Sequence, residues 1–174
     1  MEQEKLRYPT GRFKYGEKYT ESDTSHAIKR ISEFPEKLRQ TISQIPKEKL
    51  NLTYRDEGWT GLQVINHLGD VYINAYMRTK WVLTEDRPTL KPYDENGCSR
   101  LPDSFYGEID ITLGVLDNLI KRWIFLLRAI PSTAFSREIY HPELQLFMRL
   151  DEVVATYAWH GYHHIAHLEI IKNK

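Results

Sequence analysis

Apolar residues recur at three- and four-residue steps in four long stretches of the chain, the spacing of one face of an amphipathic helix. The stretches cover residues 24–46, 60–87, 109–130 and 151–168. Prolines stand at or just beyond the ends of the first three, at Pro46, Pro88 and Pro131. The pattern therefore predicts four long helices.

Local signals refine two of these helices. Pro35 lies inside the first stretch, where a proline kinks or divides a helix. Thr60 and Gln63 have the spacing of a capping box, in which each side chain bonds the backbone N–H of the other. We therefore expect a first helix that is kinked or divided at Pro35 and a clean start of the second at Thr60.

The remaining segments lack helical periodicity. Residues 1–21 are predicted as an extended arm, because Pro9 and Gly11 break helices, and residues 88–104 form a long polar loop. Residues 137–148 read as a small β-hairpin. The predicted fold is mainly α, a four-helix bundle with a small β-hairpin and an extended N-terminal arm. We expect one domain over 1–174, with the arm at 1–21 and the bundle at 22–174.

Composition and charge exclude several classes of protein. The 174 residues suit one domain. The 24 Lys and Arg balance 24 Asp and Glu, so the chain has no net positive charge that would attract nucleic acid or an acidic membrane. No stretch has the length of a transmembrane helix, and the charged N-terminus shows no secretory signal. The single cysteine, Cys98, excludes an internal disulfide framework and a Cys-rich zinc site. We expect a cytoplasmic protein that binds neither nucleic acid nor membrane.

The chemical signal is a group of histidines near the C-terminus. Four of the seven histidines fall between His160 and His167. His160 and His164 lie one helical turn apart, and so do His163 and His167, so that either pair could hold a metal ion. A third ligand must come from another helix, and His67 is the candidate. Three histidines with an open fourth position are typical of a catalytic metal site rather than a structural one.

Other residues have weaker claims. Asp70, one turn after His67, could accept a hydrogen bond from the imidazole or could be solvated. Cys98 has no histidine or aspartate near it at a spacing typical of a nucleophile. Arg78 and Arg122 could be surface charges or could approach a pocket. No phosphate-binding loop, nucleophile elbow or HExxH motif is present.

Several short motifs resemble one known family. They are Tyr8-Pro9-Thr10-Gly11, Tyr54-Arg55-Asp56-Glu57-Gly58-Trp59-Thr60, Asn66-His67-Leu68, Arg87-Pro88, Pro92-Tyr93-Asp94-Glu95, Tyr140-His141-Pro142, Trp159-His160 and His163-His164-Ile165-Ala166-His167. Their order and spacing resemble the YfiT-like metal-dependent hydrolases of the DinB-like superfamily, over almost the whole chain. The resemblance implies a three-His site for one divalent ion, zinc or nickel, formed by His67, His160 and His164. It thereby favours the His160 pair over His163 and His167.

The resemblance also leads to functional expectations. A hydrolase would use the ion to activate water for attack on a small-molecule substrate. The superfamily also contains transferases that use low-molecular-weight thiols such as bacillithiol, and a non-catalytic metal-binding stress module is a second alternative. The family further implies a homodimer, to which the aromatic arm could contribute. The chain departs from the family pattern at three positions. The pattern leads us to expect Ser where this chain has Gly161, His where it has Tyr162, and a Trp near Cys98.

Overall fold

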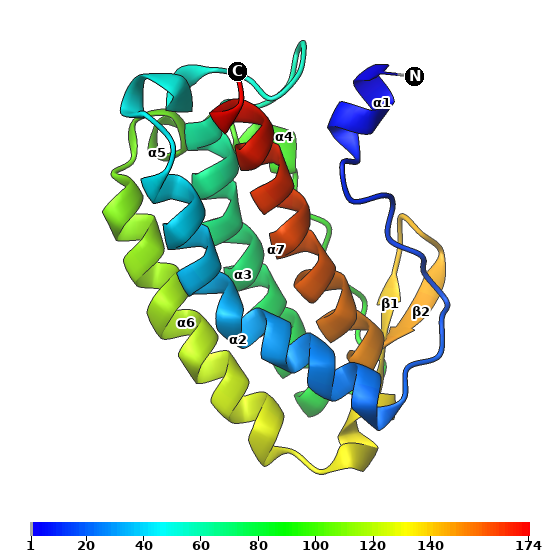
Figure 1. The fold of residues 1–174 in the computed structure, drawn as a ribbon. Helices are drawn as coiled ribbons and strands as arrows, with labels where there is room; N and C mark the ends of the chain where they lie inside the picture. Colours follow the sequence, from blue (N-terminus) through cyan, green and yellow to red (C-terminus); the bar gives the residue numbers. More distant parts are fainter. Residues whose placement is uncertain (1) are drawn as a thin grey trace.

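Four long helices form the body of the protein, which we describe from a computed structural model covering residues 2–174. They are α2 (Glu21–Ser43), α3 (Gly61–Thr84), α6 (Ile109–Ala129) and α7 (Leu150–Lys172). Helices α2 and α7 run in one direction, and α3 and α6 run in the opposite one (Figure 1). Each of α2 and α3 packs against both α6 and α7. The predicted mainly α four-helix bundle is confirmed.

The two sequence signals within the helices have different outcomes. Thr60 and Gln63 form the predicted capping box, with Gln63 N donating to Thr60 Oγ1 at 3.2 Å and Thr60 N donating to Gln63 Oε1 at 3.0 Å. Helix α2 is continuous from Glu21 to Ser43 and is not divided at Pro35, although it changes direction along its length (Figure 1). Proline has no backbone N–H and so removes one hydrogen bond from the helix. The ring of Pro35 is buried in the bundle.

A long crossover joins the two parallel helices α3 and α6. Because they run in the same direction, the connection from residue 85 to residue 108 returns along the bundle (Figure 1). It contains two short helices that periodicity did not predict, α4 (Glu95–Cys98) and α5 (Pro102–Tyr106). The segment predicted as a plain loop is therefore partly helical. Two 3-10 turns, η1 (Lys47–Asn51) and η2 (Ser132–Ser136), complete the other connections.

The predicted hairpin is present as β1 (Glu138–His141) and β2 (Leu146–Arg149), paired antiparallel. In its turn, Leu144 N donates to His141 Nδ1 at 3.3 Å. The crossover is fastened to β1, since Leu90 N donates to the Tyr140 carbonyl at 2.8 Å and Tyr140 N donates to the Pro88 carbonyl at 2.9 Å. The hairpin thus fixes the start of the crossover.

The N-terminal arm lies along α7 (Figure 1). It turns at Tyr8–Gly11, where Gly11 N donates to the Tyr8 carbonyl at 3.0 Å, and has no helix or strand from there to Thr20. Its first described residues differ from the prediction, because Glu2–Arg7 form a short helix, α1. The helix breakers Pro9 and Gly11 follow α1. They therefore end this helix but do not prevent the preceding residues from forming it. Acidic residues in its first turn and basic residues in its last suit the helix dipole.

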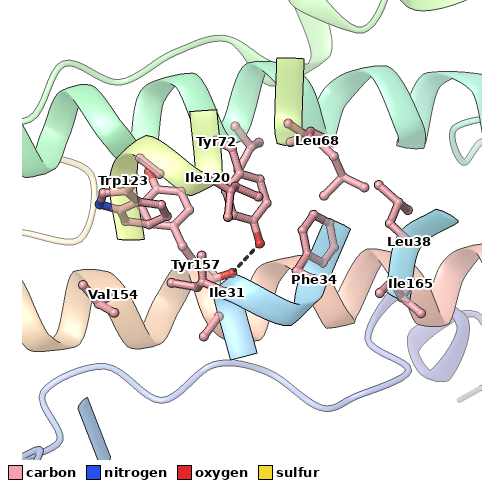
Figure 2. Packing of buried hydrophobic residues seen from close by; sticks show 14 of the residues in the cluster. Ile31, Phe34, Leu38, Leu68, Tyr72, Ile120, Trp123, Val154, Tyr157 and Ile165 are labelled. Atoms are coloured by element: carbon pink, nitrogen blue, oxygen red, sulfur yellow. Dashed lines mark hydrogen bonds between the residues drawn. The ribbon is translucent and has the colours of Figure 1, made fainter. Parts of the chain in front are cut away.

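Aromatic side chains fill the centre of the bundle (Figure 2). The rings of Phe34 and Tyr72 stack with centroids 4.9 Å apart, and Tyr72 Oη donates to the Tyr157 carbonyl at 3.2 Å. The fully buried Trp123 donates from Nε1 to Thr79 Oγ1 at 3.0 Å. These buried polar atoms are thus paired, as a stable core requires. Across residues 2–174, none of the helices combines the length and apolar character needed to span a membrane.

Candidate metal centre

Two helices bring three histidines together inside the bundle. His67 projects from α3, and His160 and His164 project from α7 one turn apart. One ligand atom from each lies within 4.8 Å of those of the other two. The ring centroids are 5.4 Å apart for His67 and His160, and 4.9 Å apart for His67 and His164. This grouping is the one expected from the resemblance, and its donor set suits zinc or nickel.

Unpaired nitrogens mark this group as a place where a ligand fits. His67 Nε2 and His160 Nδ1 are buried and have no hydrogen-bond partner among the described residues. A buried polar atom without a partner costs free energy, so native structures rarely leave two side by side. A divalent ion accepting both lone pairs would satisfy them.

Tyr93 orients His67. Its Oη lies 2.8 Å from His67 Nδ1, and the crossover between α3 and α6 carries it there. If Nδ1 carries the proton, His67 donates to Tyr93 and keeps the lone pair of Nε2 free. The sequence suggests Asp70 for this position, and the structure places Tyr93 there instead. Asp70 is near enough for its charge to raise the pKa of Tyr93, though burial is the larger cause.

His164 is oriented by a chain of contacts that ends in the N-terminal arm. His167 Nε2 donates to the Arg7 carbonyl at 3.2 Å, because a carbonyl oxygen can only accept. A neutral imidazole has one N–H, so His167 Nδ1 is an acceptor. The Nδ1 of His164 lies 3.2 Å away and must therefore be the donor. His164 consequently keeps the lone pair of Nε2 free.

Burial keeps these imidazoles uncharged. Desolvation lowers the pKa of His67 to about 3, and the charge of His167 is a second cause. Desolvation also places the pKa values of His160 and His164 well below the usual range, with neighbouring histidines adding to the effect. Neutral imidazole is the form that binds a metal, so no proton has to be displaced near pH 7.

His163, which with His167 forms the alternative pair of ligands in the sequence, faces the arm instead. Its Nδ1 lies 3.1 Å from Thr10 Oγ1, and its ring stacks on Trp159 with centroids 4.6 Å apart. His163 and His167 thus contact the arm, whereas His160 and His164 approach His67. Equal spacing along the helix could not distinguish the two pairs; the elements packed against each face do.

A cavity of about 740 Å³ reaches the histidine group. Its wall includes His160 and Tyr93, and it extends past Arg78 to the hairpin residue His141. The sequence allows Arg78 either at the surface or in a pocket, and the structure places it in this pocket. Arg122 lies outside it, donating from Nε to Tyr76 Oη at 2.9 Å on the exposed side of the bundle. A volume of this size is typical of sites for small molecules.

Cys98 does not show the features of a nucleophile. Burial raises the pKa of its thiol, and the nearby charge of Asp70 raises it further. A reactive cysteine instead needs a depressed pKa, since the thiolate is the attacking species.

Comparison with known protein families identifies the chain. The family model described as the DinB superfamily matches residues 30–168. The chain belongs to the DinB superfamily. This DinB protein is 38% identical over 163 residues to YfiT of Bacillus subtilis, which is named as a candidate metal-dependent hydrolase; the match covers 94% of the chain and 92% of YfiT. A protein of Bacillus cereus with the same description is 38% identical over 169 residues, covering 97% of the chain and 96% of the relative.

A solved structure agrees with these matches. The structure of Bacillus subtilis YfiT, described as a metal-dependent hydrolase candidate with an unusual four-helix bundle topology, aligns with a TM-score of 0.93 and 37% identity. The alignment covers 97% of both chains. The DinB protein therefore shares the YfiT fold over nearly its whole length.

Proposed function

We propose that this DinB protein is a metal-dependent hydrolase whose divalent ion is held by His67, His160 and His164. The observation that carries the proposal is the convergence of three buried, neutral imidazoles, two with unpartnered nitrogens, beside a cavity sized for a small molecule. The names of its relatives support the same reading. The proposal includes zinc or nickel as the ion, a small-molecule substrate, a cytoplasmic location and a homodimeric state.

Each part of the site has a distinct task in this proposal. A divalent ion on three neutral ligands supplies Lewis acidity and lowers the pKa of a water molecule in the open position. Tyr93 and His167 would hold the proton on the Nδ1 atoms of His67 and His164, so that both rings would have Nε2 lone pairs available for the ion. The cavity beside His160 receives the substrate.

The metal site is tested by elemental analysis of purified variants. His164→Ala should reduce the bound metal to a small fraction of the wild-type stoichiometry, because two imidazoles bind a divalent ion much more weakly than three. His163→Ala is the matched control, since it removes an adjacent histidine that faces the arm, and it should retain the metal. Undiminished metal in His164→Ala would contradict the ligand assignment.

The reaction is tested separately on the metal-loaded protein. A panel of esters and amides is assayed alongside a haloaromatic electrophile, with and without bacillithiol or glutathione. We expect metal-dependent hydrolysis without added thiol. Conjugation that requires the thiol, without hydrolysis, would replace the hydrolase with a thiol transferase. Tight metal binding without turnover in either assay would favour the non-catalytic module.

A further inference from the structure

The wall of the cavity beside the histidine group combines apolar side chains with polar and charged ones. Apolar side chains contribute much of its lining, from Val71, Leu90, Met148 and Val153. His160 belongs to its wall, and the cationic side chain in the same wall is Arg78. Polar side chains, among them Asn74, Asn96 and Thr156, line much of the rest. In a small-molecule site such polar groups fix the orientation of the ligand.

Arg78 and the histidine group share one face of α3. His67, Val71, Asn74 and Arg78 follow one another at steps of four, three and four residues, which places them in a line along the helix. Val71, Asn74 and Arg78 all line the cavity. The guanidinium of Arg78 therefore lies along the cavity from His67, and the space between them is the length available to a ligand.

The protein itself holds the guanidinium in place. Nη1 donates to Tyr157 Oη at 2.6 Å, and Nη2 donates to the Lys91 carbonyl at 3.3 Å. Tyr157 lies three residues before His160 on α7 and lines the same cavity. Two of the five N–H groups of the guanidinium are thus engaged with neutral acceptors, and three have no acceptor among the described residues. Arg78 is positioned but not saturated.

No described carboxylate forms an ion pair with Arg78, although other arginines of the bundle have one. Arg39 pairs with Asp117, for example, and Arg149 pairs with Asp151 at 2.6 Å. Asp94 and Glu143 belong to the same cavity wall, yet neither pairs with Arg78; Asp94 Oδ1 instead accepts from Gly97 N at 2.8 Å. A half-buried guanidinium without an anion is an arrangement that an incoming carboxylate would complete, through charge-assisted hydrogen bonds.

We propose that Arg78 binds a carboxylate group of the substrate while the reacting group of the same molecule lies at the histidine group. The proposal rests on the proposed function and names its substrate class. The substrate is a small molecule with an apolar body and one carboxylate, placed at the end remote from the bond that reacts. The acidic residues of the cavity wall, Asp94, Glu95 and Glu143, disfavour a carboxylate beside them and so direct it to Arg78.

Matched hydroxamates test this, because a hydroxamate binds a protein-held metal whatever reaction the protein catalyses. Monohydroxamates of succinic, glutaric and adipic acid are compared with their methyl esters, which lack the negative charge. Their affinities for the zinc-loaded protein are measured by calorimetry. For the best chain length, the free carboxylate should bind roughly ten- to a hundredfold more tightly than its ester, the gain expected of a charged hydrogen bond.

Variants assign the gain to one residue. Arg78→Met should abolish the preference for the free carboxylate while leaving ester binding intact, and Arg78→Lys should retain part of it. Arg122→Met is the matched control, because it removes the same charge from an arginine that also donates to a tyrosine but lies outside the cavity. Equal affinity of acid and ester in the wild type, or a preference that survives in Arg78→Met, would overturn the proposal. The wild-type comparison decides the matter even if Arg78→Met does not fold.

A metal-free arm separates this proposal from the metal site. If neither hydroxamate binds, the metal centre has failed, and butyrate is then titrated into metal-free protein while the Nε–H resonance of Arg78 is followed by NMR. A saturable shift for Arg78, without one for Arg122, would retain the carboxylate site independently of the hydrolase. Absence of any shift at Arg78 would overturn the carboxylate site as well as the metal centre.

Discussion

His167 Nδ1 lies 3.2 Å from His164 Nδ1, and this contact determines which nitrogen of His164 is free for a metal. The Arg7 carbonyl fixes His167 as a donor from Nε2 and therefore as an acceptor at Nδ1. The proton of His164 is in turn held on Nδ1. A backbone group of the N-terminal arm thereby sets the tautomer of a candidate ligand on α7.

The first prediction concerns this contact. His167→Phe retains an aromatic ring that can stack on Tyr54, as His167 does at 3.8 Å between centroids, but it removes the acceptor facing His164. We expect metal affinity to fall roughly ten- to a hundredfold, the usual effect of removing a group that orients a ligand. Competition with a chromophoric chelator measures the affinity.

The control for this prediction is His163→Phe, which changes a neighbouring histidine that bonds Thr10 rather than a ligand. Its metal affinity should stay within about twofold of the wild type, since no group that orients a ligand is lost. Nitrogen NMR of metal-free protein should also show the Nδ1–H form of His164 in the wild type and a changed form in His167→Phe. Identical affinities and an unchanged tautomer would show that His167 only fills space.

A second prediction concerns Gly161, which lies between the candidate ligands on α7. A Cβ built there would contact Tyr72 Oη and would lie 2.8 Å and 2.9 Å from the Cδ2 and Cε2 atoms of Phe34, inside the stacked core of Figure 2. Gly161→Ala should therefore destabilise the protein by about 1–3 kcal/mol, the cost of overpacking, despite the better helix propensity of alanine. Urea denaturation of the metal-free protein measures the change.

Gly114 provides the matched control on α6. A Cβ there meets no atom within 4 Å, so Gly114→Ala gains helix propensity without a clash and should stabilise by up to about 1 kcal/mol. Opposite signs for the two substitutions are the expected result. Stabilisation by both would contradict the close packing of α2 and α3 against Gly161.

This glycine also explains one departure from the family pattern. The resemblance led us to expect Ser at position 161, and the sequence alone indicated only a weakened helix. In the structure the absence of a Cβ admits the rings of Phe34 and Tyr72. Helical periodicity identified the faces of the four long helices that pack in the bundle. It did not show that α7 is buried on a second face, which the arm covers, and it carries no information about which pairs of helices approach so closely.

The candidate site was predictable where it depends on local spacing. His160 and His164 share a face because four residues make about one turn, and His67 was found because an inward histidine on another helix needs a partner. Tyr93 was missed as the partner of His67, since its position depends on the path of the crossover. The arm contacts to His163 and His167 were also beyond the pattern, because an extended segment has no periodic face to indicate where it docks.

A third prediction concerns pH. Burial lowers the pKa of His163 to about 4, and burial together with nearby charge lowers the pKa values of His67 and His167 to about 3, all from 6.5. Between these values the unfolded chain binds protons that the folded protein excludes. The contribution of these neutral histidines to the free energy of unfolding is therefore complete above pH 6.5. It is lost as the pH falls towards 4 for His163 and towards 3 for His167.

Urea denaturation of metal-free protein at about pH 7.5 and about pH 5.5 should accordingly show a lower free energy of unfolding at the lower pH. His163→Phe should show a smaller decrease, since it removes one group that protonates only on unfolding while keeping a ring to stack on Trp159. An equal decrease in both proteins would contradict the neutral, buried state of His163.

The last prediction concerns the homodimer. The arm lies on α7 of its own chain, through the contacts of Arg7 and Thr10, so it is not free to reach a neighbour by those residues. Exposed apolar side chains are instead found on the outer faces of the adjacent helices α3 and α6, at Ile73, Met77, Ile111, Val115 and Phe125. The side chain of Phe125 is 77% exposed. A second copy covering this surface would remove it from water, which is the main driving force of association.

Light scattering should therefore give twice the chain mass of 20.6 kDa at working concentrations. Phe125→Glu should shift the protein towards the monomer, because it places a charge where the partner would pack. Leu144→Glu is the control, since it adds the same charge at an exposed apolar position in the hairpin turn, away from α3 and α6. A monomeric wild type would contradict the homodimer, and a dimer unaffected by Phe125→Glu would move its interface to another surface.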